Sequence, residues 1–360
     1  MSITPASSSA RLASVDALRG ITVAAMLLVN DPGDWGHVYW PLDHAEWNGC
    51  TPTDLIFPFF LFIVGVSIAL AFGPRLERAD ARATLLRAAM GRALRILVLG
   101  VAINLLAAWL LPGREMRWPG VLQRIGVCFA VTAGLAIYTP RRAWWSSLVA
   151  LLVGYAVLLH LGGLAKWDNL VDRVDGALFG RYVWDHNAVT GQVHDPEGLL
   201  STLPAIGSTL LGLCAGAWLR VGARRTLLVA GTVLLAAGWL GSLAMPFNKN
   251  LWTPTFVLWT TGWAMLALLA SHVLIDCRGW PPLGRRFGVN AIAAYAGSEL
   301  MQILLPASGL QVVLYERGFA RWITPLAGPY VASLAWAIAF VAFWWIVVWA
   351  MDRRRIYLKL

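Results

Sequence analysis

The sequence predicts an all-α polytopic membrane protein with about ten transmembrane helices. Of its 360 residues, 58% are hydrophobic and only 13% are charged, whereas a soluble domain usually contains about 25% charged residues. Ten spans of about 20 residues would use about 200 apolar positions, while a single water-soluble core could not bury that much apolar surface. The composition therefore excludes a soluble globular protein.

Ten apolar stretches have the length of a membrane-spanning helix. The first is the least apolar, because Asp16 and Arg19 interrupt it, and the second, with the run LIFPFFLFIVGVSIALAF, is the clearest. The predicted spans are residues 15–30, 54–72, 93–111, 121–138, 143–160, 199–219, 226–244, 255–274, 287–305 and 328–350. We interpret residues 15–350 as one transmembrane domain between the tails 1–14 and 351–360.

The basic residues predict how these helices are oriented. If the N-terminus is cytoplasmic, the segments on its side hold 19 Lys and Arg residues, from Arg11 to Lys359, and the segments on the other side hold 8. Cytoplasmic loops carry the excess of positive charge in membrane proteins, so both termini are predicted to be cytoplasmic. The same distribution accounts for the net charge of +10. Because the bases are not interleaved with aromatic residues as in a nucleic-acid site, we expect membrane lipids and no nucleic acid as partners.

Several chemistries have no support in the sequence. The four cysteines show no C-x-x-C spacing, which indicates neither a disulfide framework nor a zinc site. The motifs G-x-x-x-x-G-K-[ST], H-E-x-x-H and G-x-S-x-G are also missing, so the sequence offers no phosphate loop, zinc-protease site or serine-hydrolase elbow. We therefore expect no metal.

Two long loops on the predicted external side are acidic and aromatic. Residues 31–53 contain no Lys or Arg but hold four acidic residues and two histidines. Residues 161–198 add six acidic residues, and at 38 residues this loop is longer than a connector needs, so we expect a small cap or lid. Such a composition is typical of sites for sugars and amines and also of ordinary solvated loops. Composition alone leaves both interpretations open.

Four charged residues lie within predicted spans, where a charge needs a partner or an aqueous cavity. Asp16 and Arg19 are three residues apart and share one helix face, so they form either a structural ion pair or a site where Arg19 holds a ligand phosphate. Arg124 lies one turn into the fourth span and Glu299 near the middle of the ninth. A contact between these two side chains is a further possibility that spacing does not decide.

The segment before the second span places polar and aromatic residues beside the end of a helix. His44 belongs to this segment, and histidine is the side chain whose charge changes close to neutral pH. A catalytic base or nucleophile and an ordinary loop histidine both fit this position. The neighbouring candidates for substrate contacts are Asp43, Glu46, Trp47, Asn48 and Asp54.

Six segments, in order along the chain, resemble the heparan-α-glucosaminide N-acetyltransferase family of membrane acyltransferases, in its bacterial-type form without a lumenal N-terminal domain. The second segment is the most specific, because HAEWNG followed by a span that begins D-x-x-F-P is long and unusual. The segments are RLASVDALRGITVAAMLLVN (11–30), DHAEWNGCTPTDLIFPFFLFIVGVSI (43–68), GVLQRIGVC (120–128), DPEGLLSTLPAI (195–206), PFNKNLWTPTFVL (246–258) and GVNAIAAY (288–295).

The resemblance implies transfer of an acetyl group from cytoplasmic acetyl-CoA to an amino sugar of the glucosamine type on the far side of the membrane. The active histidine of the family falls on His44, and the asparagine that assists it falls on Asn30. The resemblance also implies a homodimer in a bacterial inner membrane. Acetyl transfer to an amine needs a base and a donor for the developing oxyanion, which are roles that His44 and Asn30 fit.

Coenzyme A carries several phosphate charges, so its nucleotide is expected to contact cytoplasmic bases. The nearest candidates are Arg19, Arg92 and Arg95, with Asn290 at the cytoplasmic end of the ninth span. His44 could act as a base for direct transfer, or it could hold the acetyl group covalently for a time. An O-acyltransferase of a cell-surface or lipid-linked glycan would differ only in the acceptor. A secondary transporter would show two related halves with broken helices, and no such internal symmetry is visible.

Overall fold

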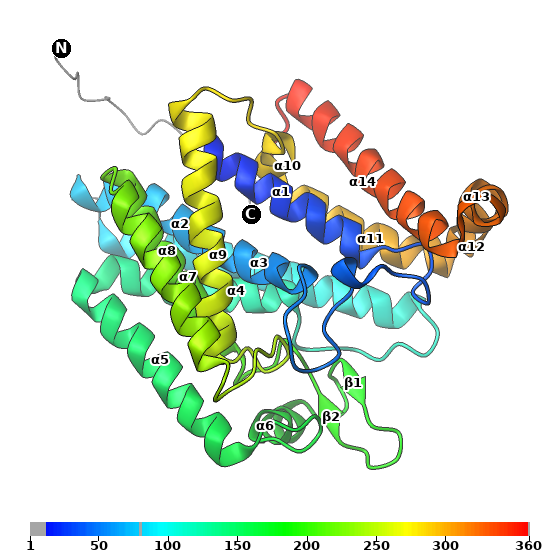
Figure 1. Ribbon diagram of the computed structural model, residues 1–360, viewed down its shortest axis with the longest axis horizontal. Coiled ribbons are helices and arrows are strands. Elements are labelled where there is room, and N and C mark those ends of the chain that lie inside the picture. The colour runs from blue at the N-terminus through cyan, green and yellow to red at the C-terminus, as the bar shows by residue number, and fades with distance from the viewer. Residues whose placement is uncertain (1–11, 79–80, 359–360) are drawn as a thin grey trace.

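The apolar runs of the sequence form long helices that pack side by side, as the computed structural model in Figure 1 shows. The structure describes residues 12–78 and 81–358. The helices are α1 (Ala13–Asn30), α2 (Ile56–Glu77), α3 (Arg82–Leu110), α4 (Val121–Tyr138), α5 (Arg141–Gly162), α6 (Leu170–Phe179), α7 (Thr202–Arg220), α8 (Arg224–Gly241), α9 (Pro254–Ser271), α10 (Arg285–Val289), α11 (Ala291–Ala307), α12 (Leu310–Tyr315), α13 (Arg321–Ala327) and α14 (Pro329–Arg353). Short helices η1 (Trp40–Leu42) and η2 (Thr53–Leu55) precede α2, and the π-helices η3 (His272–Cys277) and η4 (Glu316–Ala320) follow α9 and α12. The basic residues Arg11 and Lys359, which were counted for orientation, lie outside the described residues.

The predicted all-α membrane fold is confirmed. Eight helices of the described residues are long and apolar enough to cross a membrane. The other two predicted spans, 226–244 and 287–305, correspond to the helices α8 and α11 but are not among these eight. The two arginines at the start of α8 lower its mean hydropathy, and α11 is short, with only 17 residues. Residues 310–327, which were predicted to be part of an external connection, instead form α12, η4 and α13.

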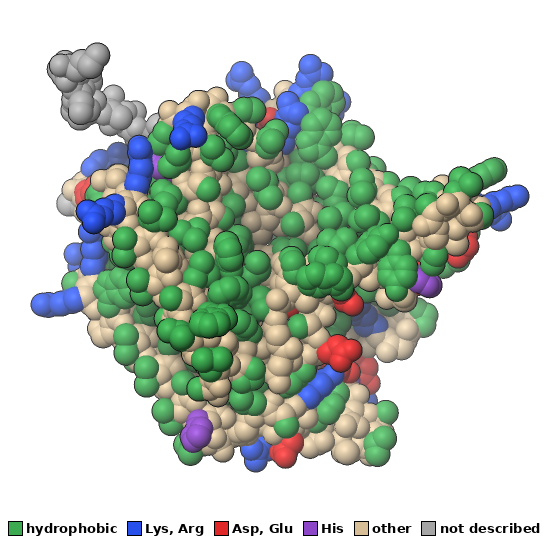
Figure 2. Space-filling model, in the orientation of Figure 1, with side chains coloured by type: hydrophobic (Ala, Val, Ile, Leu, Met, Phe, Trp, Pro, Cys, Tyr) green, Lys and Arg blue, Asp and Glu red, His purple; other side chains and the backbone are tan. Residues whose placement is uncertain are grey.

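Loops that share a predicted side lie together. Hydrogen bonds join the predicted external loops: Trp47 Nε1 to the Leu164 carbonyl, the Trp118 N–H to the Tyr182 carbonyl, and Asn248 Nδ2 to Asn48 Oδ1. The Gly33 N–H also donates to the Ser333 carbonyl near the start of α14. At the other end, ion pairs and hydrogen bonds join Ser14 to Asp276, Arg220 to Glu77 and Arg286 to Asp352. Figure 2 shows most Lys and Arg side chains of this face along its upper and upper left edges, with a mainly hydrophobic middle. Which end faces the cytoplasm stays a prediction from the basic residues.

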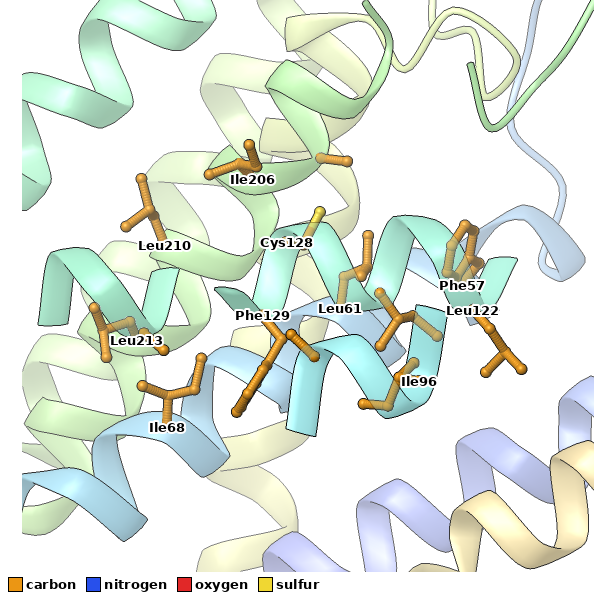
Figure 3. Close-up of a cluster of buried hydrophobic side chains, with 14 of the residues drawn as sticks. Phe57, Leu61, Ile68, Ile96, Leu122, Cys128, Phe129, Ile206, Leu210 and Leu213 are labelled. Atoms are coloured by element: carbon orange, nitrogen blue, oxygen red, sulfur yellow. The ribbon is translucent and has the colours of Figure 1, made fainter. Parts of the chain in front are cut away.

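Close contact between α2 and α7 forms the centre of the bundle. A Cβ added at Gly65 would lie 1.9 Å from the Thr209 carbonyl oxygen, and one at Gly212 would lie 2.0 Å from the Phe62 carbonyl oxygen. Only glycine allows two membrane helices to approach so closely. Side chains from α2, α3, α4 and α7 interdigitate around this contact, as Figure 3 shows. The packing fixes the first turn of α2, which carries part of the site described below.

The loop 161–198, expected to form a cap, contains α6 and a two-stranded antiparallel sheet of β1 (Asp185–His186) and β2 (Val193–His194). Buried Asp172 organises it, because its carboxylate accepts hydrogen bonds from the Trp167 N–H (3.0 Å) and Asn169 Nδ2 (2.6 Å) and pairs with His194 Nδ1 (2.5 Å). The Trp47 ring packs against the His194 ring, with centroids 5.1 Å apart. Through Trp47 the cap is attached to the loop 31–53.

Asp175 is a second buried carboxyl group of the cap. One of its oxygens accepts a hydrogen bond from the Leu199 N–H at 2.8 Å, and the other has no hydrogen-bond partner in the described part of the chain. Burial raises the pKa of Asp175 to about 7, although the Leu199 hydrogen bond opposes this shift. The carboxyl group is therefore neutral in the folded cap below about pH 7.

We expect Asp175→Asn to stabilise the protein in a pH-dependent way. Unfolded Asp175 loses its proton near pH 4, so between about pH 4 and 7 the folded state binds more protons and the stability of the wild type falls as pH rises. The amide keeps an acceptor for the Leu199 N–H without a charge. Thermal unfolding of the detergent-purified protein gives the Tm of the variant and of the wild type at each pH. The Tm of the variant minus that of the wild type should grow from pH 5 to pH 8, by ~2–4 °C for each kcal/mol that the substitution adds to the free energy of unfolding. A difference that does not change with pH would contradict the assignment.

Candidate active site

His44 and Asp54 form a hydrogen-bonded pair at the N-terminal end of α2. His44 Nδ1 lies 2.7 Å from Asp54 Oδ1, and the side chains are 42% and 0% exposed. The second carboxylate oxygen, Oδ2, accepts hydrogen bonds from the Ala45 N–H (3.1 Å), the Thr51 N–H (2.9 Å) and Thr51 Oγ1 (3.1 Å). Asp54, predicted as a substrate contact, is thus buried behind His44, where it orients the imidazole.

The partners of Asp54 determine which nitrogen of His44 carries the proton. An ionised carboxylate only accepts hydrogen bonds, so His44 Nδ1 donates its N–H to Asp54 and the Nε2 lone pair is left free. Lys249 Nζ lies 3.1 Å from both ring nitrogens. An atom equidistant from both nitrogens at this distance must lie over the face of the ring, because in the ring plane it would overlap a ring carbon. Lys249 therefore does not block the in-plane lone pair of Nε2.

A small cavity of about 60 Å³ joins His44 to Asn30. Its polar lining comes from the end of α1, the loop 31–53, η2 and the loops before α7 and α9, and its apolar lining comes from α1, α2 and α4. The lining residues are Met26, Val29, Asn30, His44, Thr53, Ile56, Phe57, Val121, Glu197 and Lys249. The two residues that the resemblance singled out therefore line one cavity.

Glu197 and Lys249 are cavity residues that the sequence did not identify. Burial lowers the pKa of Lys249, and the carboxylates of Asp54 and Glu197 oppose that shift. Burial alone would raise the pKa of Glu197, but Arg117, Arg124 and Lys249 lower it below its ordinary value. The only sequence signal was that both residues lie in segments that resemble the family, DPEGLL and PFNKNLW.

Arg117 fixes the acidic segment that carries Glu197. Its Nε and one terminal nitrogen contact the two oxygens of Asp195 at 2.8 and 2.6 Å, and the same terminal nitrogen pairs with Glu197. The guanidinium also lies over the Trp184 ring, 4.9 Å from its centroid. Although burial opposes it, the two carboxylates raise the pKa of Arg117. Because Arg117 pairs with both carboxylates, it holds Glu197 in place at the cavity.

The contact considered between Arg124 and Glu299 is not made in the described part of the chain. Arg124 is buried, donates hydrogen bonds to the Gly198 carbonyl (3.3 Å) and to Ser201 Oγ, and lies over the Trp252 ring. Glu299 instead interacts with Tyr295 on its own helix and faces Arg114 and Arg117. A single sequence could not predict which loops fold over each of these charges.

The other predicted substrate contacts differ in accessibility. Asp43, Glu46 and Asn48 are exposed in the loop 31–53, whereas Trp47 is turned into the cap and donates to the Leu164 carbonyl at 2.8 Å. Cys50, in the same loop, is half-buried, and burial beside Asp54 raises the pKa of its thiol to about 12. Cys50 is therefore a poor position for thiol labelling of this face. Among the described residues, no group of three or more His, Cys, Asp or Glu side chains could hold a metal ion.

At the opposite end, two of the four candidate coenzyme contacts lie near each other. Arg19 pairs with Asp16 (3.0 Å) and also donates to the Gly288 carbonyl (3.1 Å) and Ser67 Oγ (2.8 Å). Of the two alternatives for these residues, the ion pair is present, and a phosphate contact of Arg19 stays a prediction. Asn290 is buried at the start of α11, and within residues 12–78 and 81–358 neither polar atom of its side chain has a hydrogen-bond partner.

The other two candidates, Arg92 and Arg95, lie on α3. The Arg92 guanidinium stacks on the Phe129 ring of α4, 5.3 Å from its centroid. In the described residues no hydrogen bond or ion pair links these two arginines to Arg19 or Asn290, so a ligand that contacts all four would have to bridge α1 and α3.

Comparison with known proteins supports one relationship. A family model described as the catalytic region of heparan-alpha-glucosaminide N-acetyltransferase matches residues 11–247. The chain is 28% identical to the human protein of that name, in an alignment 415 residues long that covers 97% of this chain and 60% of the human protein. It is 29% identical over 365 residues to the mouse protein, covering 83% of this chain and 55% of the mouse protein. The chain thus spans a little over half the length of these curated relatives.

Proposed function

Because the chain belongs to the family of the heparan-α-glucosaminide N-acetyltransferase catalytic region, we propose that it transfers an acetyl group from acetyl-CoA to the amine of a glucosamine-type sugar. One observation carries the proposal. An imidazole that Asp54 orients, with its Nε2 lone pair free, lines the same cavity as the amide of Asn30. This is the base and the donor that acyl transfer from a thioester requires.

In the direct route, the sugar amine attacks the thioester carbon while Nε2 of His44 takes a proton from the nitrogen. The C–N bond forms, the C–S bond breaks, and the proton passes from His44 to the departing thiolate. The products are the N-acetyl sugar and coenzyme A, and His44 returns to its starting state. Asp54 holds the imidazolium that exists between the two proton transfers, as the carboxylate of a Ser-His-Asp triad does.

The thioester oxygen gains negative charge in this reaction and needs donors. Asn30 offers a side-chain N–H at the cavity, and Lys249 offers an ammonium 3.1 Å from His44 Nε2. Donors preorganised where charge develops make the largest single contribution in many enzymes. We assign Asn30 as the oxyanion donor and Lys249 as a second, charged donor.

Asn30→Ala should lower kcat about a hundredfold and change the Kd for acetyl-CoA little. The reason is that one oxyanion donor, used mainly in the transition state, is worth ~3 kcal/mol. Steady-state kinetics together with isothermal titration of acetyl-CoA would separate the two effects. A variant that loses coenzyme affinity and keeps kcat would show that Asn30 binds the donor substrate instead.

A two-step route remains compatible with the same residues. Nε2 of His44 would attack the thioester carbon, release coenzyme A and hold the acetyl group until the amine displaces it. The routes differ when no acceptor is present: only the two-step route releases one equivalent of coenzyme A per active site. Rapid quenching of the enzyme with acetyl-CoA alone measures that release.

We propose that the coenzyme enters from the end of the bundle that carries most of the arginines. The neighbourhood of Arg19 and Asn290 supports this, since a buried amide without a partner is costly unless a ligand or water satisfies it. Arg92 and Arg95 on α3 would contact the nucleotide from the other side. The pantetheine arm would then extend toward Asn30 and His44.

Arg19→Ala and Arg95→Ala should each weaken acetyl-CoA binding by about 10- to 150-fold and leave the KM for the sugar nearly unchanged. A hydrogen bond to a charged group contributes ~1.5–3 kcal/mol. Isothermal titration of coenzyme A measures the loss, with Arg225→Ala at the start of α8 as the matched control. Equal affinities in all three variants would reject the assignment.

A panel of acceptors tests the function itself. Labelled acetyl-CoA should modify glucosamine and leave an N-blocked glucosamine unmodified. Modification of both sugars would indicate an O-acyltransferase, and uptake of sugar into vesicles without any acetylated product would indicate a transporter. We further propose that the chain is an integral protein of a bacterial inner membrane and forms a homodimer, as the family resemblance implies. Light scattering of the detergent complex would test the dimer.

A further inference from the structure

A cysteine, a histidine and an aspartate converge at the end of α9 that lies opposite the active site. His272 Nδ1 lies 2.9 Å from Asp276 Oδ2, and Cys277 Sγ lies 3.7 Å from His272 Nε2. The three residues belong to the π-helix η3. Hydrogen bonds from residue i to i+5 widen a π-helix, and this geometry brings positions 272 and 277 to one face.

Asp276 is held in place by the start of α1. The Ser14 N–H donates to Asp276 Oδ1 at 3.2 Å, and Ser14 Oγ donates to Asp276 Oδ2. The carboxylate therefore acts as an acceptor for His272, whose Nδ1–H points to Asp276 and whose Nε2 lone pair faces the thiol. A nucleophile, a base and a group that orients the base are thus arranged as in cysteine-dependent acyl transfer.

Cys277 differs from the other three cysteines of the chain in its surroundings. Cys128 and Cys214 are buried among the helices, and Cys50 is half-buried at the other end of the bundle, whereas Cys277 is exposed. Exposed Trp280 and Leu283 follow it, as is typical of a segment at the membrane surface. A thioester reagent in solution or with its chain in the bilayer could reach this thiol.

We propose that Cys277 is a second acyl acceptor, which takes an acyl group from a coenzyme A thioester with His272 as the base. The thiol gives its proton to Nε2 of His272, Sγ attacks the thioester carbonyl, the bond from carbon to the coenzyme sulfur breaks, and the proton passes to the coenzyme thiolate. One thioester replaces another, so no oxidant, reductant or further reagent is needed. The choice of a coenzyme A thioester as the donor, and of the side of the membrane from which it arrives, rests on the proposed function. The site itself does not share a residue with the His44 cavity.

The test uses the full chain in detergent micelles, incubated in separate arms with radiolabelled acetyl-CoA and radiolabelled palmitoyl-CoA. Peptide mass spectrometry locates the label, and neutral hydroxylamine releases it if it is a thioester. We expect label on Cys277 with at least one donor, and none on this peptide in Cys277→Ser. The arm that labels faster identifies a short-chain or a long-chain donor.

Four further variants separate the chemistry at Cys277 from folding and from the reaction at His44. His272→Gln should slow labelling tenfold or more, because a positioned base typically contributes about 10²–10⁴ in rate, while Cys50→Ser should label at the rate of the wild type. If His272→Gln does not fold, Asp276→Asn replaces it as the test variant. Its Tm is measured to show that it is folded, and its labelling should also be slower than that of the wild type. His44→Ala should label Cys277 normally, so loss of sugar acetylation and loss of Cys277 labelling are distinguishable. Absence of label in both arms, or labelling that neither His272→Gln nor Asp276→Asn slows, would overturn the proposal.

Discussion

Replacing His44 by alanine should remove nearly all acetyl transfer, with kcat lowered by about 10²–10⁴, while the protein still folds and binds acetyl-CoA. Without the imidazole, the cavity loses the base that Asp54 orients. General base catalysis contributes about 10²–10⁴ in rate, and in the two-step route the nucleophile itself would be lost. The side chain is 42% exposed, so its removal costs little packing, and we expect a Tm close to that of the wild type.

The loop 31–53 offers a matched control for this variant. His37 Nδ1 lies 2.7 Å from Asp34 Oδ2, the same distance as in the pair of His44 and Asp54. His37 is also partly exposed, but it packs against Tyr330 and does not line the cavity. His37→Ala should therefore retain transfer. If His44→Ala kept near-normal turnover with acceptors of different basicity, the proposed mechanism would be wrong.

The fold could be predicted from the sequence because a bilayer leaves few alternatives. An apolar run of about 20 residues must satisfy its backbone internally, so it forms a helix, and helices cover most of each of the ten predicted ranges. The segment from α12 to α13 was missed because its apolar residues are interrupted by Arg317 and Arg321 and do not reach the length of a span. Its helices depend on packing against α14, where Tyr315 and Phe319 contact Trp336.

Residues of the candidate site could be proposed from the sequence only where they are close in the chain or marked by the resemblance. His44 and Asn30 met both conditions. The role of Asp54 was not predictable, because whether a carboxylate at a helix start faces solvent or a neighbouring ring depends on how the loop folds back. Glu197 and Lys249 are more than 150 residues from His44 in sequence, and they reach the cavity through loops whose pairing cannot be read from local sequence patterns.

Asp54→Asn should lower kcat by about 10²–10⁴ without removing any side chain from the cavity. The amide has one acceptor and one donor end. Its oxygen must occupy the Oδ2 position, because the N–H groups of Ala45 and Thr51 both donate there. The NH₂ group then faces His44 Nδ1, so Nδ1 becomes the acceptor and the ring proton moves to Nε2. The wrong nitrogen is protonated, and the loss should resemble the ~10⁴ loss for the corresponding change in a serine protease.

This outcome separates orientation of the ring from the mere presence of charge. The Kd for acetyl-CoA and the Tm should stay close to those of the wild type, because the shape and the backbone hydrogen bonds of Asp54 are kept, while kcat falls. Asp34→Asn is the matched control: it makes the same change in the exposed pair with His37, where the carboxylate also accepts a hydrogen bond from the Gly36 N–H, and it should leave kcat unchanged. A fall in kcat of less than about threefold in Asp54→Asn would show that the tautomer of His44 does not limit the reaction. The acetyl group would then have to be transferred without His44 Nε2 as the base, which would also remove the argument that assigns catalysis to this cavity.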